Sequence, residues 1–575
     1  MLAPRGPIES MNSEETDEKF YRDTESVAFP KLDDHQLALL APLGTRRIVP
    51  KGGVIAHAGQ RDFPMMVVIR GELEVFALQD GIEQILSTAG PRDFVGDVAS
   101  LNGTSSLASV RGSAEESDIL EIPPAELRRA LAELPGVGEP IVQAFIMRRE
   151  RLQRDREFAG LRIVAHSGCR EGHRIDDFLD KNHIPHRLIS AEQAEGQSLC
   201  TRLGITADRL PVLIANDGAP LHTPSIREVA QIAGLLRPLA TEGTAEILCD
   251  LAIVGAGPAG LSAAVNAASE GLVTVVLESY APGGQAGSSS LIENFFGFPT
   301  GISGGALTNR AQLQAYRFGA KFSTPSPAIS LSFSDGEYGS TLWIGGCPAL
   351  LRAKCVIIAT GAEYNRIDAE GREDFESMGV YYAATAMESQ FCRDATAVVA
   401  GAGNSAGQAA MFLSEIAAHV VLVVRGDDLS KSMSSYLSRR VETKANIEIL
   451  HRTEIRRMTG NSRLEAVELE NTRTGERRTI QTPAVFSMIG AKPCTSWLPP
   501  EILRDEKQFV KTGATVADAP AWKAAARAPL PMETSRPGIF AAGDVRSGSV
   551  KRCSAAVGEG GMAIDGVHQL LGTYA

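Results

Sequence analysis

The chain has 575 residues, with 69 acidic against 57 basic side chains and 44% hydrophobic residues. At about 150 residues per domain, this length predicts three or four domains. The acidic excess, with no Lys/Arg cluster, argues against a nucleic-acid partner. Eight scattered cysteines without a C-x-x-C pair argue against disulfide scaffolds and metal sites, and favour a reducing cytoplasm. No apolar leader and no run of eighteen apolar residues occurs, so we expect neither secretion nor a membrane partner.

The first segment, 1–26, is polar and acidic. It is predicted to be an arm, because its apolar surface is too small to offset the entropy of ordering unless another domain holds it. Residues 27–150 start with a helical stretch and continue as short alternating runs punctuated by glycine, which predicts a β-roll. A helix-forming segment closes the roll and continues through 151–160 as a charged helical connector.

Residues 94–110, FVGDVASLNGTSSLASV, give this roll its resemblance to a cyclic nucleotide-binding domain. The resemblance implies a phosphate cassette in which a Gly-Glu pair holds ribose and phosphate and an arginine pairs with the cyclic phosphate. Gly96 and Asp97 occupy the Gly-Glu positions, but the arginine position falls on Ser106, which cannot supply a bidentate cationic contact. Two alternatives stay open: a cyclic nucleotide-binding domain, or a module for docking or dimerisation.

Residues 161–238 read as a β-α-β…β-β-α unit that resembles a thioredoxin or glutaredoxin domain. The resemblance implies a C-x-x-C at a helix N-terminus, where the helix dipole lowers the pKa of the first cysteine. Here the motif is C-R-E-G, so Cys169 keeps the nucleophile position and Gly172 replaces the resolving cysteine. Pro211 stands where that family has a cis-proline. Cys169 is therefore either a catalytic monothiol or a relic.

Residues 251–279, LAIVGAGPAGLSAAVNAASEGLVTVVLES, predict a strand, a glycine turn, a helix and a second strand. In the G-x-G-x-x-G turn, Gly255 permits the tight bend, Gly257 lets a pyrophosphate approach the backbone, and Gly260 lets helix pack on strand. Glu278 ends the second strand and can accept a hydrogen bond from a ribose hydroxyl. The unit therefore predicts dinucleotide binding.

From 251 to 575 the chain resembles low-molecular-weight thioredoxin reductases, through P-G-G-Q, I-E-N-F, F-P-x-G-I-S-G, A-T-G and F-A-A-G-D-V-R. The resemblance implies FAD as a cofactor, because several independent segments agree. It also implies site residues: Gly283, Gly284, Gln285 and Asn294 along the flavin, Gly361 at its pyrophosphate, Asp544 accepting from the ribityl chain, and Lys551 and Arg552 beside the isoalloxazine.

A second βαβ unit, TAVVAGAGNSAGQAAMFLSE followed by HVVLVVRGDD, lies within 364–489. It repeats the dinucleotide-binding pattern, but no Asp or Glu stands at the position that would accept a hydrogen bond from a ribose 2′-hydroxyl. Arg425 stands there instead, which suits a 2′-phosphate and favours NADPH over NADH. The predicted nucleotide-binding residues are Gly401, Gly403, Asn404, Ser405, Ala406 and Arg425.

Together these units predict an α/β multidomain protein. Its core is two Rossmann-like dinucleotide-binding domains of thioredoxin reductase type, preceded by the β-roll and the thioredoxin-like domain. The expected boundaries are 1–26, 27–150, 151–160, 161–238, 247–363 with 490–575 for the FAD-binding domain, and 364–489 for the NAD(P)H-binding domain.

The dithiol that defines thioredoxin reductases is missing, because its two cysteines align with Ala383 and Ala386. Hydride transfer from nicotinamide to flavin needs stacking geometry rather than cysteines, so that step can persist. The first hypothesis is therefore an FAD-dependent NADPH oxidoreductase with an unidentified electron acceptor, such as a small redox protein. The alternatives are an atypical disulfide reductase using Cys169, and a redox sensor or scaffold without sustained turnover. We expect a homodimer.

Overall fold

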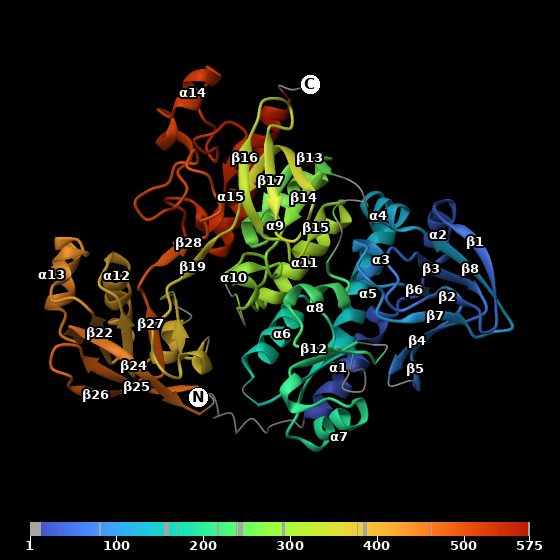
Figure 1. The fold of residues 1–575 in the computed structure, drawn as a ribbon, viewed down its shortest axis with the longest axis horizontal. Coiled ribbons are helices and arrows are strands. Elements are labelled where there is room, and N and C mark those ends of the chain that lie inside the picture. The colour runs from blue at the N-terminus through green and yellow to red at the C-terminus, as the bar shows by residue number, and fades with distance from the viewer. Residues whose placement is uncertain are drawn as a thin grey trace, which may run out of the picture.

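In the computed structural model the chain forms a β-roll, a small mixed α/β unit and two larger α/β units (Figure 1). The two larger units lie beside each other, and the roll and the small unit pack against one of them. The structure describes residues 13–79, 82–154, 160–167, 169–215, 218–236, 239, 245–289, 292, 294–376, 378–382, 384, 388–461 and 463–572.

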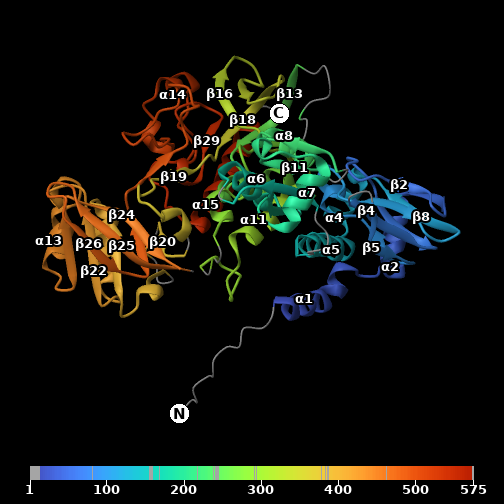
Figure 2. The same ribbon diagram turned by 60° about the horizontal axis from the view of Figure 1, so that its bottom comes forward.

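The prediction of a polar arm is wrong over the part of it that the structure describes. These residues form helix α1 (Ser13–Ala28), which lies along α5 (Pro135–Arg154), as Figure 2 shows. Arg151 of α5 donates to the Tyr21 carbonyl oxygen over 2.9 Å and pairs with Glu25 at 2.6 Å. The cost of ordering α1 is offset by this second helix, a contact that the local sequence does not contain.

The predicted connector at 151–160 begins as the last turn of α5, which runs to Arg154. Residues 155–159 lie outside the described residues. The helical segment that closes the roll is two helices rather than one, with α4 (Pro124–Glu133) ending just before α5 begins.

The β-roll has two four-stranded sheets, ordered β1-β8-β3-β6 and β2-β7-β4-β5. Strand β3 lies between two parts of the core, because alternate side chains of a strand point to opposite faces. Met65 and Val67 pack with α4 and α5, whereas Met66 and Val68 point into the roll. The elements before α4 are α2 (Asp34–Leu40), β1 (Thr45–Pro50), β2 (Val54–Ala56), β3 (Met65–Arg70), β4 (Leu73–Gln79), β5 (Ile82–Ala89), β6 (Phe94–Val95), α3 (Val98–Asn102), β7 (Ser109–Gly112) and β8 (Glu116–Ile122).

The small unit has a four-stranded sheet in the order β10-β9-β11-β12, with β10 parallel and β11 antiparallel to β9. The elements follow the order predicted for 161–238, with one further helix between the second and third strands. The Leu210–Pro211 peptide bond is cis. The elements are β9 (Leu161–Ala165), α6 (Arg170–Lys181), β10 (His186–Ser190), α7 (Ala194–Leu203), β11 (Val212–Ile214), β12 (Pro220–His222) and α8 (Ile226–Ile232).

The first large unit has the sheet β15-β14-β13-β18-β17-β16, with β29 paired to β18. Strands β13, β14, β15, β18 and β29 run parallel, so their carboxyl ends share one edge of the sheet. The elements are β13 (Glu246–Val254), α9 (Pro258–Ser269), β14 (Thr274–Leu277), α10 (Gly284–Gly287), α11 (Gly304–Arg317), β15 (Lys321–Ser323), β16 (Ala328–Phe333), β17 (Ser340–Ile344), β18 (Leu350–Ile358), α14 (Pro520–Ala525), β29 (Ile539–Ala541) and α15 (Cys553–Leu571).

The second large unit is reached through two strands, β19 (Ala362–Tyr364) and β28 (Ala491–Pro493), which pair with each other. Its parallel sheet has the order β20-β27-β21-β22-β23, and an antiparallel sheet β24-β25-β26 lies beside it. The elements are β20 (Val380–Tyr381), β21 (Thr396–Ala400), α12 (Asn404–Leu413), β22 (His419–Val424), α13 (Ser435–Thr443), β23 (Ile447–His451), β24 (Thr453–Gly460), β25 (Leu464–Asn471), β26 (Arg477–Gln481) and β27 (Ala484–Ser487).

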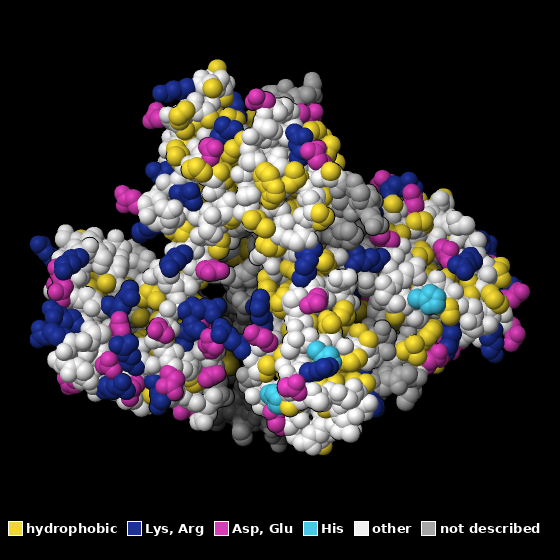
Figure 3. All heavy atoms as spheres, viewed as in Figure 1, with side chains coloured by type: hydrophobic (Ala, Val, Ile, Leu, Met, Phe, Trp, Pro, Cys, Tyr) yellow, Lys and Arg dark blue, Asp and Glu magenta, His cyan; other side chains and the backbone are white. Residues whose placement is uncertain are grey.

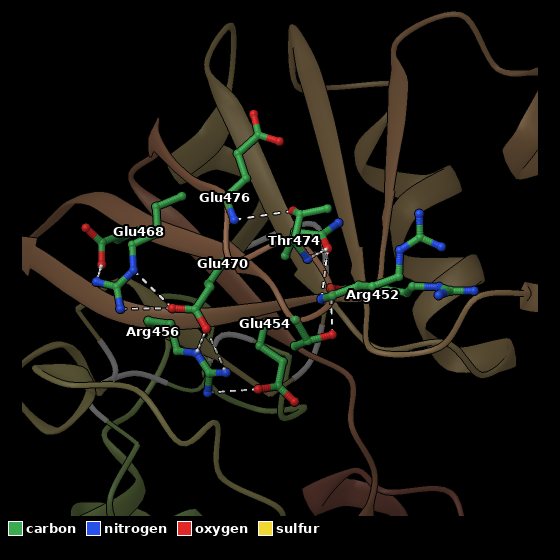
Figure 4. Close-up of polar contacts among 11 residues, drawn as sticks. Arg452, Glu454, Arg456, Glu468, Glu470, Thr474 and Glu476 are labelled. Carbon is green, nitrogen blue, oxygen red and sulfur yellow. Dashed lines mark hydrogen bonds and ion pairs between the residues drawn. The ribbon is translucent and has the colours of Figure 1, made fainter.

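The exposed face of β24-β25-β26 carries a ladder of ion pairs (Figure 4). Arg456 pairs with Glu454 at 2.9 Å and with Glu470 at 3.2 Å, and Arg477 pairs with Glu468 at 2.8 Å. Figure 3 shows Lys and Arg interspersed with Asp and Glu over this lobe. Exposed pairs of this kind contribute little stability each.

Within the described ranges, no helix combines the length and apolar character needed to cross a bilayer. The same part of the chain brings no three His, Cys, Asp or Glu side chains together in an arrangement that could hold a metal ion.

Candidate functional site

The first glycine turn joins β13 to α9 at the carboxyl edge of the larger sheet. Gly255 has a φ of +101°, and a side chain there would run into the Ala359 backbone. A side chain at Gly260 would overlap the Gly255 carbonyl, so strand and helix pack directly on each other. Gly257 is different, because its φ of −72° is ordinary and it has open space in front of it. The turn therefore offers backbone to a ligand at Gly257.

The P-G-G-Q segment closes on this turn from the other side. Gly283 donates its N–H to the Ala256 carbonyl over 2.7 Å. A Cβ at Gly284 would lie 3.1 Å from the Gly257 Cα, so the two segments pack backbone against backbone. Gln285 donates its side-chain amide to the backbone of β19. The N-terminus of α9, beside this contact, has no side-chain cap and offers backbone N–H groups to a pyrophosphate.

Glu278 follows β14 and is 8% exposed. Its carboxylate accepts the N–H of Ala256 at 2.8 Å and the N–H of Tyr280 at 2.9 Å. Burial raises the pKa of Glu278, while these hydrogen bonds oppose that rise. The carboxylate is thus fixed beside the glycine turn, where it can accept from a ribose hydroxyl.

Tyr280 links this segment to the small unit, a contact that sequence reasoning missed. Its hydroxyl donates to Asp177 of α6 over 2.9 Å, and its ring meets the Phe178 ring edge-on at 5.3 Å. Asn182 donates to the Tyr280 carbonyl over 3.3 Å. Because the partners lie about 100 residues apart in sequence, no local pattern could have indicated them.

The pair Gly543-Asp544 follows β29 and lies at the same carboxyl edge of the larger sheet. Gly543 donates its N–H to Glu559 over 2.7 Å, and Glu559 pairs with Arg546 at 2.6 Å. Arg546 of the turn and Glu559 of α15 therefore hold the turn in place. Sequence analysis identified neither of them. Asp544 itself is half-buried, and burial raises its pKa while Lys551 lowers it.

The remaining predicted flavin residues differ in placement. Gly361 follows β18 with a φ of +67° and open space around it. Lys551 donates to the Asp544 carbonyl over 2.8 Å, which places it at this edge. Arg552 caps the start of α15 and is exposed, and Asn294 is exposed in the loop after α10. The structure therefore brings Gly361 and Lys551 to the site, whereas no side-chain contact among the described residues fixes Arg552 or Asn294 there.

The second glycine turn joins β21 to α12 in the same way. Gly401 has a φ of +143°, and Gly403 starts α12 without a side-chain cap, which leaves backbone N–H groups for a phosphate. Asn404 accepts the Ser434 N–H over 2.8 Å. The predicted residues of this turn are all present in it: Gly401, Gly403, Asn404, Ser405 and Ala406, of which Ser405 is exposed and Ala406 is buried.

Arg425 lies exposed at the end of β22, and none of the described residues forms a hydrogen bond or ion pair with it. The nearby Asp427 is engaged by Lys431 at 3.0 Å and by Arg452 at 3.3 Å. Asp427 therefore does not form an ion pair with Arg425. Arg452 follows β23, the strand that pairs in parallel with β22, and no local pattern indicated that it would lie there.

Where the domains meet, Tyr364 of β19 stacks on Tyr382, with ring centres 5.2 Å apart and planes 19° apart. Burial, and to a lesser degree Asp544, raises the pKa of Tyr364 to about 12. Tyr382 of this pair, which sequence reasoning missed, directly precedes the segment where the dithiol of thioredoxin reductases is expected. Ala383 and Ala386 themselves lie outside the described residues.

Cys169 is half-buried at the start of α6, as the resemblance implies for the first cysteine of the motif. A Cβ at Gly172 would overlap the Ala165 side chain and would lie 3.7 Å from the Cys169 sulfur. The position of a resolving cysteine is therefore filled by close packing of α6 on β9.

In the roll, the cassette positions are engaged by the protein itself. Asp97 pairs with Arg149 of α5 at 3.0 Å. Ser106 is 7% exposed, and its hydroxyl donates to the Ala108 carbonyl over 2.6 Å. The residues that would meet ribose and cyclic phosphate thus bond to neighbouring groups of the chain.

Two parts of the chain match models of known protein families. Residues 249–560 match the family model of pyridine nucleotide-disulphide oxidoreductases, and residues 46–133 match the cyclic nucleotide-binding domain. Thioredoxin reductase of Treponema pallidum is 33% identical over 314 residues, which are 55% of this chain and 94% of that protein. Thioredoxin reductase of Bacillus subtilis is 31% identical over 56% of this chain and 94% of its own length.

Among solved structures, thioredoxin reductase of Giardia duodenalis is 28% identical, with a TM-score of 0.50, over 56% of this chain and 99% of its own. Thioredoxin reductases use FAD and NADPH, and the two glycine turns fit those dinucleotides. The match covers both large units, and it continues from the first glycine turn to the helix after the G-D pair. The chain belongs to the pyridine nucleotide-disulphide oxidoreductase family.

Proposed function

We propose that the protein is an FAD-dependent oxidoreductase that takes hydride from NADPH and passes electrons to an acceptor other than a dithiol of its own. The observation that carries the proposal is the first glycine turn, where Gly257 starts α9 without a side-chain cap and a Cβ placed on it would have no atom closer than 4.0 Å. FAD, when bound, supplies a centre that accepts two electrons from a nicotinamide. The glycine turn would hold its pyrophosphate, Glu278 its ribose and Asp544 its ribityl chain.

The preference for NADPH rests on Arg425. Its guanidinium is exposed and has no ion pair within the part of the chain that the structure describes. Asp427, the carboxylate that would compete for it, already has Lys431 and Arg452 as partners. A 2′-phosphate is therefore the partner that Arg425 can take, and a bare 2′-hydroxyl gains little from it.

An acceptor screen tests this function. The purified protein, kept anaerobic, is given NADPH with a quinone, a small redox protein or a small-molecule acceptor in turn, and oxygen is tested separately. We expect sustained NADPH consumption with at least one acceptor. Flavin that is reduced once and never reoxidised by any of them would favour the redox sensor instead.

A second candidate function, disulfide reduction through Cys169, is favoured by one observation. We infer a thioredoxin-like unit from the order β-α-β…β-β-α, the cis Leu210–Pro211 bond and Cys169 at the start of α6. The same helix is bonded to the flavin-binding unit through Tyr280. A lone thiol there would form a mixed disulfide that needs an external thiol to resolve it.

Turnover with oxidised thioredoxin should be absent or very slow, because alanines stand at both dithiol positions. Any weak activity should vanish in Cys169→Ser, whereas reduction of the flavin by NADPH should survive. Cys200→Ser is the matched control, since Cys200 is another half-buried cysteine of the same unit. NADPH consumption is the measurement, and rapid turnover that persists in Cys169→Ser would show that another cysteine reaches the flavin.

The roll should bind neither cyclic AMP nor cyclic GMP tightly. Ser106 replaces a charge-assisted bond worth about 1.5–3 kcal/mol, and Arg149 already neutralises Asp97. We therefore propose that the roll is a docking module. Titration calorimetry decides, and a sub-micromolar dissociation constant for either nucleotide would overturn this view.

A further inference from the structure

A cavity of about 60 Å³ lies where the roll, the small unit and the flavin-binding unit meet. Figure 1 shows α3, α5 and α11 approaching one another there. The roll contributes α3 and α5, the small unit contributes the turn between α6 and β10, and the flavin-binding unit contributes α11. The polar side chains that line it include Arg149, Asn182, His183, Asn309 and Gln312.

Arg149 is the charged group of this cavity and is 8% exposed. One of its terminal nitrogens pairs with Asp97 at 3.0 Å. Its Nε is buried and has no hydrogen-bond partner among the described residues. A buried donor without an acceptor costs free energy, more so on a charged group, so the structure lacks one partner for Arg149.

A second arginine stands beside Arg149 in the chain. Arg148 is half-buried, donates to the Ala28 and Gly96 carbonyls, and has its pKa lowered by burial to about 10. Asp97 and Asp93 both oppose that lowering, and Asp93 also pairs with Lys31. Arg148 thus has its partners within the roll, and the Nε of Arg149 is the buried donor that lacks an acceptor among the described residues.

The rest of the lining suits a small anion. Burial lowers the pKa of His183, and Arg149 lowers it further while Asp180 opposes, so the imidazole is neutral and can donate one hydrogen bond. The side-chain amide of Asn309 forms no hydrogen bond with any described residue, which leaves it for a ligand. Gln312 donates to the Tyr316 hydroxyl over 3.0 Å and presents its remaining groups to the cavity.

We propose that this cavity binds a small tetrahedral oxyanion, with inorganic phosphate as the representative ligand, held by Arg149 and the amides of α11. The volume is that of about four to six water molecules, which excludes a nucleoside. The bound anion would contact residues of all three units. The site thus differs from both the cyclic-phosphate position at Ser106 and the dinucleotide sites, and it does not depend on the proposed redox reaction.

Titration calorimetry of the full-length protein with inorganic phosphate tests the proposal. Saturating FAD and NADP⁺ are present to fill the other phosphate sites, and ionic strength is held constant with chloride. We expect saturable one-to-one binding that sulfate competes for. Arg149→Gln should weaken it at least tenfold, and Arg129→Gln, which removes an exposed arginine of the neighbouring helix α4 that does not line the cavity, should leave it within twofold.

Arg149→Gln also breaks the pair with Asp97, so a second variant protects the test against misfolding. Gln312→Leu and Asn309→Leu together remove the amides of α11 without touching that ion pair, and should also weaken phosphate binding. Two results would overturn the proposal. One is the absence of binding at millimolar phosphate, which would mean that only water fills the cavity. The other is binding that neither variant changes, which would place the ion elsewhere.

Discussion

Gly257→Val should yield a folded protein that purifies without FAD. The backbone at Gly257 is ordinary, with a φ of −72°, and the nearest atom to a new Cβ would be the Gly284 Cα at 4.0 Å. The new Cβ therefore causes no clash in the protein itself. The substitution places a side chain where the pyrophosphate would meet the N-terminus of α9 and removes charge-assisted hydrogen bonds worth about 1.5–3 kcal/mol each. Loss of two would weaken FAD binding by about 100-fold or more.

The measurement is the ratio of flavin to protein absorbance after purification, with the circular dichroism melting curve as a check on folding. Gly558→Val is the matched control, because Gly558 is exposed on α15 with no atom within 4 Å of a new Cβ. It should keep its flavin. A Gly257→Val protein that is folded and fully yellow would show that the pyrophosphate lies elsewhere.

Arg425→Ala should abolish most of the preference for NADPH over NADH. The lost charge-assisted contact to the 2′-phosphate predicts a fall in kcat/KM for NADPH of about 10- to 150-fold, with the value for NADH nearly unchanged. Arg439→Ala is the control, since Arg439 is an exposed arginine of α13 in the same unit. Anaerobic stopped-flow reduction of the flavin with each nucleotide gives both values.

A variant that keeps its preference would move the 2′-phosphate to another cation, and Arg452 is the next candidate. A wild-type protein that prefers NADH would contradict the role of Arg425 altogether.

The sequence predicted the parts of the site that local geometry dictates. Gly255, Gly257 and Gly260 were recognisable because a sharp turn with no room for side chains must fall between a buried strand and a helix. Parallel strands then brought Glu278, Gly361 and Asp544 to one edge, as their positions at strand ends imply. These residues needed no knowledge of partners distant in the chain.

The features that the sequence did not reveal all depend on distant partners. Helix α1 is ordered because Arg151, more than a hundred residues later, binds it. Glu559 holds the G-D turn through Arg546, and Tyr280 joins the ribose segment to α6. Ordinary residue types carry out these roles, so composition and spacing give no sign of them.

The same reasoning explains the roll. The strand pattern predicted its architecture, but not that Arg149 of the following helix would reach the cassette and pair with Asp97. That contact and the hydrogen bond of Ser106 are the observations on which the proposed docking role of the roll rests.

The most direct test is anaerobic titration of the purified, FAD-loaded protein with NADPH while the flavin absorbance is recorded. The account predicts that the flavin band bleaches with one equivalent of NADPH, faster than with NADH, and that Cys169→Ser leaves this reduction unchanged. A flavin that stays oxidised in excess NADPH would contradict the proposed oxidoreductase.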